Sequence, residues 1–213
     1  MDLHIAEYVK FITLAIVPFM LAITVHEFSH GYSAYLLGDD TAKRAGRLTL
    51  NPLAHIDPLG ILFLVVTRLF GWAKPVPVNF GNLHRNRKYG AAIVSFAGPF
   101  SNLILALISA GIIRILYGVQ VPEGSMVMKI LVPLAGMVSL SVQINLALFI
   151  FNLIPILPLD GGRILQSFLP FRQAIAFSKT ERYGFIILIL LFMTHAIDAV
   201  IMPVMGFFLK ILL

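Results

Sequence analysis

Four long apolar stretches, separated by shorter polar connections, dominate the hydropathy pattern of the chain. They are Phe11–Leu37, Ala91–Tyr117, Val127–Phe151 and Tyr183–Leu213. An α-helix rises about 1.5 Å per residue, so each stretch is long enough to cross a hydrocarbon core of about 30 Å. The pattern predicts an all-α polytopic membrane protein with about four to five transmembrane segments.

The last of these stretches leaves two interpretations open. It holds 31 residues and is interrupted by Asp198 and Pro203. It is either one kinked helix or a span followed by a second helical piece, and the second interpretation is preferred. His195 and Asp198 lie three residues apart in it, and packing within the helical bundle is the default expectation for both.

The connection between the first two spans has a different pattern. Ile61–Trp72 is apolar but too short to span, so we expect it to be re-entrant, interfacial or packed inside the protein. In Ala73–Asn79, which reads AKPVPVN, the prolines oppose helix and confine a strand to the edge of a sheet. The sequence therefore predicts a re-entrant, β-containing loop whose edge strand can accept the backbone of another chain.

The composition agrees with membrane insertion and narrows the chemistry. Hydrophobic residues make up 59% of the 213 and charged residues 12%, with a mean hydropathy of +0.91. These values exclude a water-soluble globule and a disordered chain. The absence of cysteine excludes disulfides, thiolate metal sites and cysteine nucleophiles. The length fits a single domain, residues 1–213.

The basic residues predict an orientation in the lipid bilayer. Lysines and arginines gather in residues 38–90 and 160–182, whereas residues 118–126 contain no base and one acid. The positive-inside rule places the basic connections in the cytoplasm, and residues 118–126 and the N-terminus on the opposite side. The formal charge of +6 is thereby explained without nucleic acid as a partner.

The first predicted span contains an H-E-x-x-H motif, His26-Glu27-Phe28-Ser29-His30. Residues four apart on a helix differ by about 40° in direction and about 6 Å in height, so both imidazoles can bind one metal ion. Glu27 lies beside them, where it can take a proton from a water on the metal and pass it to a leaving amine. An unpartnered ionisable side chain inside a membrane helix costs about 2.5–3.5 kcal/mol. Zinc binding contributes about 10–16 kcal/mol in model sites and can offset that cost, so a metal site is favoured over a chance match or a His/Glu-lined ion path.

A catalytic zinc has three protein ligands, so the two histidines need a third. The candidate is Asp160, in the run NLIPILPLDGGR at 152–163 just after the third span. The prolines and glycines of this run oppose regular helix, and irregular backbone at membrane depth lines a cavity or is buried in protein. The alternative for Asp160 is an N-cap of the next helix, and the H-E-x-x-H motif favours the ligand.

Together these motifs resemble the site-2 protease family of intramembrane zinc metalloproteases. The resemblance rests on H-E-x-x-H, on Asn152-x-x-Pro155 with Asp160-Gly161, and on Ala97-Gly-Pro-Phe-Ser-Asn102, Asn51–Pro58 and Lys74–Asn79. The matching motifs run from about residue 20 to 165. The resemblance implies a compact catalytic core of that extent, and we expect neither a PDZ nor a CBS domain.

The resemblance also implies the roles of individual residues. His26, His30 and Asp160 would bind one Zn²⁺ per chain, and Glu27 would be the general base. Asn152 would lie near the metal as a donor to the substrate carbonyl or oxyanion. The implied substrates are single-pass membrane proteins or signal-peptide remnants. They would be cut in a prokaryotic plasma membrane by a site that opens towards the cytoplasm.

Several expectations concern the surroundings of this site. Val76 and Val78, in the predicted edge strand, are expected to hold a locally extended substrate by strand addition. Asn102 either caps the second span or hydrogen-bonds into the site, where it would assist the substrate or oxyanion. His55 and Asp57 are partners of the ligand histidines or, more simply, part of a surface turn. Small residues at Gly98, Gly111 and Gly136 are expected to permit close helix contacts.

Two other classes of function compete with proteolysis. A metal or proton transporter needs ionisable residues on both sides of the site, and here they lie only towards the cytoplasmic half. A catalytically inactive relative that binds membrane helices is disfavoured because the ligands and the base are intact. The sequence therefore predicts an intramembrane zinc-dependent endopeptidase that cleaves transmembrane helices by metal-activated attack of water.

Overall fold

The computed structural model describes residues 2–60, 73–86, 89–122 and 124–213, and its regular elements within these ranges are helices. The long helices are α1 (Asp2–Leu36), α4 (Gly90–Gly118) and α5 (Met126–Asn152). The shorter ones are α2 (Thr41–Arg44), α6 (Asp160–Phe168), α7 (Phe171–Ser178), α8 (Glu181–Met193) and α9 (Ala196–Leu212), with 3₁₀ turns η1 (Pro52–His55) and η2 (Phe80–Asn82). The all-helical prediction is confirmed for this part of the chain.

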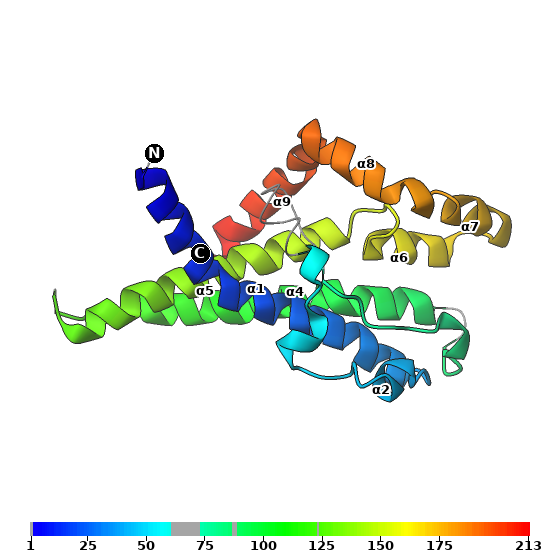
Figure 1. Cartoon of the computed structure of the whole chain (residues 1–213), viewed down its shortest axis with the longest axis horizontal. Helices are drawn as coiled ribbons and strands as arrows, with labels where there is room; N and C mark the ends of the chain where they lie inside the picture. The colour runs from blue at the N-terminus through cyan, green and yellow to red at the C-terminus, as the bar shows by residue number, and fades with distance from the viewer. Residues whose placement is uncertain (1, 61–72, 87–88, 123) are drawn as a thin grey trace.

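The three long helices pack against one another and run along most of the molecule (Figure 1). Each is long and apolar enough to cross a membrane, over Ala6–Leu36, Gly90–Gly118 and Met126–Asn152. These segments coincide closely with the first three apolar stretches of the sequence, because a helix of that length satisfies every internal backbone group while it exposes apolar side chains to lipid.

The core between the helices is built from small and medium apolar side chains. Ala106 and Ala110 of α4 lie against Val142 and Leu146 of α5, and all four are buried. Apolar side chains of α9, including Phe208, pack on the same cluster. Alanine at this contact lets two helix backbones approach closely, which is how membrane helices gain packing without a hydrophobic driving force.

The last apolar stretch forms two helices, α8 and α9, neither of which is by itself long enough to span, so the preferred interpretation of a complete span followed by a second helical piece is not confirmed. Helices α8 and α9 are bent by 74° at a short break, and the pair is apolar enough to count as one broken span. His195 occupies the break with a left-handed backbone (φ 56°), whereas Pro203 lies inside α9. The helices therefore provide three or four membrane spans, fewer than the upper limit of the prediction.

The predicted edge strand at Ala73–Asn79 is not present, and no strand occurs in the ranges that the structure describes. The physical reason is that carboxylates take the backbone donors that a sheet would use. The Val76 N–H donates to Glu27 Oε2 at 2.8 Å, and the Asn79 N–H donates to Asp39 Oδ2 at 2.7 Å. Residues 73–79, called the strap, instead lie against α1 without regular secondary structure.

The rest of the connection after α1 is partly outside the described residues, and the expectation for Ile61–Trp72 falls there. Of the two polar residues considered in this connection, His55 is buried and its Nε2–H donates to the carbonyl of Thr49 at 2.8 Å. Asp57 Oδ1 accepts the backbone N–H of Leu59 at 2.9 Å. Both bonds lie within the loop itself. Asp57 therefore agrees with the simpler interpretation as part of a turn, whereas His55 is buried and not on the surface.

Candidate metal centre

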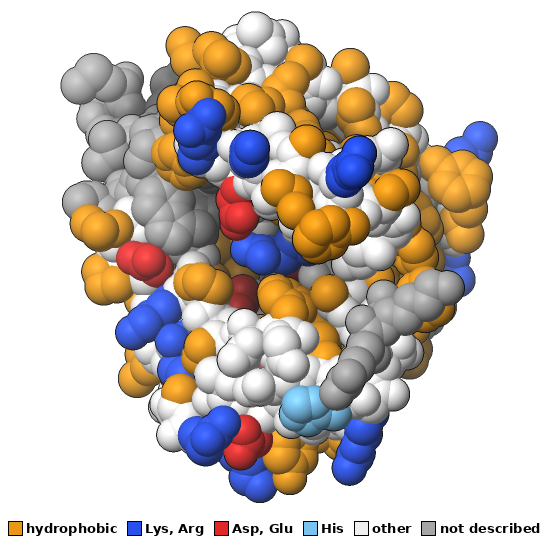
Figure 2. Space-filling model, turned by 90° about the vertical axis from the view of Figure 1, so that its right-hand side faces the viewer, with side chains coloured by type: hydrophobic (Ala, Val, Ile, Leu, Met, Phe, Trp, Pro, Cys, Tyr) orange, Lys and Arg blue, Asp and Glu red, His pale blue; other side chains and the backbone are white. Residues whose placement is uncertain are grey.

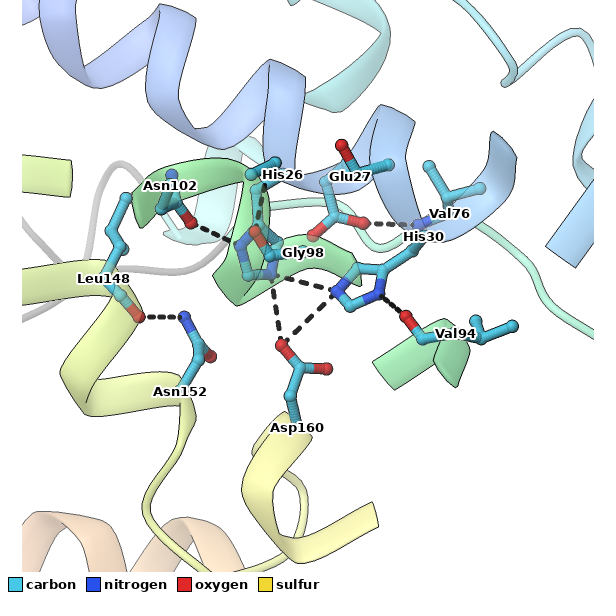
Figure 3. Close-up of polar contacts among 12 residues, drawn as sticks. His26, Glu27, His30, Val76, Val94, Gly98, Asn102, Leu148, Asn152 and Asp160 are labelled. Atoms are coloured by element: carbon cyan, nitrogen blue, oxygen red, sulfur yellow. Dashed lines mark hydrogen bonds and ion pairs between the residues drawn. The ribbon is translucent and has the colours of Figure 1, made fainter. Parts of the chain in front are cut away.

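Three side chains from two distant parts of the chain point toward one another (Figure 3). His26 and His30 lie one turn apart on α1, with their Nε2 atoms 3.0 Å apart. Asp160 Oδ2 lies 3.2 Å from His26 Nε2 and 3.3 Å from His30 Nε2. The structure thus brings together the three residues that the sequence proposed as ligands, in the one such group found among the described residues.

Asp160 reaches the histidines because a new helix begins at that residue. The N-cap position of α6 is Leu159, so Asp160 is a first-turn residue and the N-cap alternative is wrong. A Cβ on Gly161 would lie 2.5 Å from the Ile154 carbonyl oxygen, and one on Gly162 would lie 2.5 Å from the Leu157 nitrogen. The Gly-Gly pair therefore lets α6 start directly against the preceding loop, with the carboxylate of Asp160 facing α1.

The electrostatics of the centre favour an ionised carboxylate. Burial by itself would raise the pKa of Asp160, but the nearby imidazoles of His30 and His26 lower it below its ordinary range. An anionic oxygen and two imidazole nitrogens therefore converge on one point. Such a group in a buried setting needs a partner that compensates the charge.

The donor set and its spacing fit a zinc ion. Two imidazole nitrogens and one carboxylate oxygen form a metalloprotease ligand set that leaves a fourth position open. Bonds of about 2.0–2.2 Å in a tetrahedral arrangement place the ligand atoms about 3.3–3.6 Å apart. The observed separations of 3.0, 3.2 and 3.3 Å lie at or just below the lower end of that range.

Gly98 of α4 makes the room for this centre, a role that the sequence interpretation did not assign to it. A Cβ at Gly98 would lie 2.7 Å from His26 Nε2 and 2.6 Å from His30 Cε1, so any larger residue would displace the ligand rings. By contrast, a Cβ at Gly111 would meet no atom within 4 Å. The run Ala97-Gly98-Pro99 was the available signal, because it places a glycine early in an otherwise apolar span.

Both ligand histidines are oriented from behind by oxygen acceptors on α4. His30 Nδ1–H donates to the backbone carbonyl of Val94 at 2.7 Å, and His26 Nδ1–H donates to Asn102 Oδ1 at 2.6 Å. Asn102 is buried twelve residues after the first residue of α4, so it does not cap the helix. It contacts a ligand histidine, but its amide hydrogens are donated to the Ala22 carbonyl and to Asn145 Oδ1, so the expectation that it assists the substrate or oxyanion is wrong. Each bond from a histidine Nδ1–H leaves the Nε2 lone pair free for a metal.

The catalytic candidate Glu27 borders a cavity of ≈ 430 Å³. The cavity is lined by the three ligand candidates, by Asn152 and by residues of the strap, including Val76 and Val78. Asn152 is the last residue of α5 and its Nδ2 donates to the Leu148 carbonyl at 3.0 Å. A neighbouring apolar cavity of ≈ 520 Å³ is lined by Phe19, Phe151 and Phe185 and also reaches His26, Glu27 and Asn152.

His195 and Asp198, the other polar pair in an apolar stretch, do not belong to this centre. His195 Nδ1 lies 2.7 Å from Asp198 Oδ2, and both side chains are exposed at the break between α8 and α9. The pair is not the buried bundle contact that the sequence led us to expect.

Comparison with known proteins identifies the family. The profile described as “Peptidase family M50” matches residues 119–195. The chain is 40% identical over 193 residues to a Bacillus subtilis protein named “Putative zinc metalloprotease YwhC”, and the alignment covers 90% of this chain and 85% of the relative. The chain belongs to peptidase family M50, the site-2 protease family.

A second relative of this M50 peptidase extends the comparison. A Mycolicibacterium smegmatis protein named “Putative zinc metalloprotease Rip2” is 29% identical over 195 residues, which cover 90% of this chain and 71% of the relative. No solved structure gives a significant match. The expectation of a zinc metalloprotease is confirmed, and with its long apolar helices the peptidase is an integral membrane protein.

Proposed function

We propose that this M50 peptidase cleaves peptide bonds of transmembrane helices within the membrane, through a centre formed by His26, His30 and Asp160. The observation that carries the proposal is the convergence of these three ligand atoms within 4.8 Å of one another, beside the carboxylate of Glu27 at a cavity. The catalytic core, residues about 20–165, forms part of a single domain that spans 1–213. Glu27 is the general base, and Asn152 is the candidate donor to the substrate.

The metal ligands, Glu27 and Asn152 have different roles in the reaction. A zinc ion held by this ligand set supplies Lewis-acid polarisation of the scissile carbonyl and makes water more acidic. Glu27 takes the proton from the attacking water and delivers it to the leaving amine. Asn152, at the cavity wall, donates to the carbonyl oxygen as charge develops on it.

The cavity next to the centre suits an extended segment of an apolar substrate. A peptide bond in a helix is shielded by its own hydrogen bonds, so the helix must unwind locally before it is cut. We propose that the unwound segment lies along the strap at Val76 and Val78, which line the cavity of ≈ 430 Å³. The apolar cavity of ≈ 520 Å³ beside Glu27 then accepts a large apolar side chain of the substrate.

The charge distribution supports a cytoplasmic opening, and the bacterial relatives support a prokaryotic plasma membrane as the location. Figure 2 looks onto the end of the molecule that carries α2, α6 and α7 and shows Lys and Arg side chains around a hollow. Arg163 lines the cavity of ≈ 430 Å³ and pairs with Glu181 at 3.0 Å. An excess of basic residues at one end of a membrane protein marks the cytoplasmic side.

The test combines a metal measurement with a defined substrate set. We expect about one zinc per chain in the purified peptidase, largely lost in Asp160→Ala. In liposomes, the wild type should cleave synthetic single-pass helices or signal-peptide remnants, and a chelator or Glu27→Gln should stop the cleavage, as read by mass spectrometry. Cleavage of unfolded soluble protein without cleavage of any membrane helix would overturn the intramembrane function. Full zinc retention in Asp160→Ala would overturn the third ligand.

A further inference from the structure

Behind His26, on the side away from the cavity, a chain of buried polar groups crosses all three long helices. Asn102 of α4 is fully buried and Asn145 of α5 is 1% exposed. Asn102 Nδ2 donates to Asn145 Oδ1 at 2.9 Å and to the Ala22 carbonyl of α1 at 3.2 Å. Asn145 Nδ2 donates to the Ser141 carbonyl at 2.9 Å. The chain therefore begins at a backbone carbonyl of α5 and ends at the ring of His26.

The direction of every bond in this chain is determined by two backbone carbonyls, those of Ser141 and Ala22. A backbone carbonyl can only accept, so the Ser141 carbonyl obliges Asn145 to present its NH₂ group there and its Oδ1 to Asn102. Asn102 then has both amide hydrogens engaged, by Asn145 Oδ1 and by the Ala22 carbonyl. Its remaining oxygen faces His26 Nδ1 at 2.6 Å, where it accepts a hydrogen bond.

The consequence concerns the tautomer of the ligand. With an acceptor at Nδ1, the neutral imidazole carries its proton on Nδ1 and keeps the Nε2 lone pair for a metal. A flipped Asn102 amide would direct N–H groups at Nδ1, which would move the proton to Nε2 and block the metal position. We infer that Asn102 and Asn145 form a directional relay that holds His26 in the metal-binding tautomer, and that Asn145 is a positioning residue of the peptidase although it touches no ligand atom.

His30 shows why such a relay is needed at only one of the two histidines. Its Nδ1–H donates directly to a backbone carbonyl, that of Val94, at 2.7 Å. The acceptor for His26 is a side-chain amide, which can rotate, so its orientation has to be imposed by further bonds. The relay also accounts for an Asn in the middle of an apolar span, since an amide at membrane depth is costly unless its groups are paired.

The inference rests on the proposed metal centre, so its test measures zinc affinity of the purified peptidase by competition with a chromophoric chelator. The metal-free thermal unfolding of each variant is measured in parallel. We expect Asn102→Leu to weaken zinc binding about 10- to 100-fold, because the acceptor at Nδ1 is lost. Asn145→Leu should cost about ten-fold, at the lower end of that range. The double variant should bind no more weakly than Asn102→Leu alone, because Asn145 then has nothing to orient.

Asn102→Asp separates the relay from a packing role. The carboxylate keeps an oxygen acceptor for His26 but places a charge in a fully buried position. A relay predicts tighter zinc binding by Asn102→Asp than by Asn102→Leu. A packing role predicts the reverse order, because Leu is the milder change in an apolar interface. The control is Thr13→Val, which removes a 2.8 Å bond from a hydroxyl to the Val9 carbonyl within α1, outside the relay, and should leave zinc affinity unchanged.

The outcomes separate this inference from the proposed function. If the wild type binds no zinc, or Asp160→Ala binds it equally well, the metal centre itself fails. If that centre holds but folded Asn102→Leu binds zinc as tightly as the wild type, or more tightly than Asn102→Asp, the relay is overturned. Where the Asn102 variants do not fold, Asn145→Leu decides. A loss of about ten-fold supports the relay, and unchanged affinity overturns it.

Discussion

The two sides of the metal centre are built in different ways. On the inner side, the acceptors that orient His26 and His30 come from α4, inside a packed three-helix contact. On the outer side, the base Glu27 and the third ligand Asp160 are positioned by connections. The strap binds Glu27 through Val76, and the loop after α5 delivers Asp160 to the histidines.

This difference separates metal affinity from catalysis. Helices with regular backbone angles keep the inner acceptors in place without contributions from substrate. The outer side has to admit a substrate, and there Glu27 and Asp160 are held by contacts with irregular connections, the strap and the loop after α5. Changes on the inner side should therefore act first on zinc affinity. Changes at the strap should act on turnover while zinc stays bound, and the following variants test this division.

Glu27→Gln should have the largest effect and should act on turnover alone. The amide cannot take the proton from water, so cleavage of a membrane-helix peptide in liposomes should fall by about 10²–10⁴-fold. Zinc content should stay at the wild-type level because Glu27 is not in the ligand group. Glu7→Gln, an exposed position on the same helix, is the control and should cleave normally. Cleavage at the wild-type rate by Glu27→Gln would remove the base from the mechanism.

Gly98→Ala should have the next largest effect and should act on zinc. The added Cβ would lie within 2.7 Å of His26 Nε2, so the ligand rings have to move and zinc affinity should fall by about 10- to 100-fold. Gly111→Ala lies on the same helix with nothing within 4 Å of its Cβ, so it should keep wild-type affinity. Equal zinc affinities for Gly98→Ala and Gly111→Ala would show that zinc binding does not need the space left by the missing side chain at Gly98.

Gly31→Ala should produce a smaller loss on the outer side. Its Cβ would lie 2.9 Å from Val76 Cγ1, which pushes the strap and its N–H away from Glu27. Turnover of the same peptide should fall by up to about ten-fold while zinc affinity is unchanged. Gly206→Ala, a helical position with nothing within 4 Å, is the control. A loss of zinc with no loss of turnover in Gly31→Ala would reverse the assignment of the two sides.

Asp39→Asn should have the smallest effect, a modest loss of thermal stability, because Asp39 accepts a hydrogen bond from the strap at Asn79. Burial by itself would raise the pKa of Asp39, but hydrogen bonds from Thr41, Asn79 and Asn82 hold it below the ordinary value of 3.8. A lowered pKa means that the ionised group stabilises the fold above about pH 4, and that this contribution is lost as the pH falls through the lowered value. The variant lacks the carboxylate at every pH, so its deficit should appear only at the higher pH.

The measurement is thermal unfolding in detergent at pH 7 and near pH 3. We expect Asp39→Asn to unfold about 2–4 °C below the wild type at pH 7 and the difference to shrink at the lower pH. Asp40→Asn is the matched control, because the carboxylate of Asp40, the next residue in the chain, is half exposed and pairs with Arg44 at the surface. A pH-independent deficit in Asp39→Asn would mean that its charge does not matter.

The positions of the spans and of the candidate ligands could be predicted because they depend on local information. Apolar runs longer than 20 residues have one stable form in lipid, and the three long helices begin and end within a few residues of those runs, apart from the start of α1. H-E-x-x-H on a helix places two imidazoles on one face whatever surrounds it. With cysteine absent, few residues remained that could complete the ligand group with them.

The remaining features depend on contacts between residues far apart in the sequence, which only the tertiary structure decides. The strap forms no strand because Glu27 and Asp39 of distant segments take its backbone donors. The last apolar stretch breaks at His195, although Pro203 is the stronger local signal, because a proline is tolerated within a membrane helix. The sequence by itself determined which residues can bind a metal. The packing of α1, α4 and α5 decided which atoms orient them, because hydrogen-bond direction depends on what each group meets across the interface.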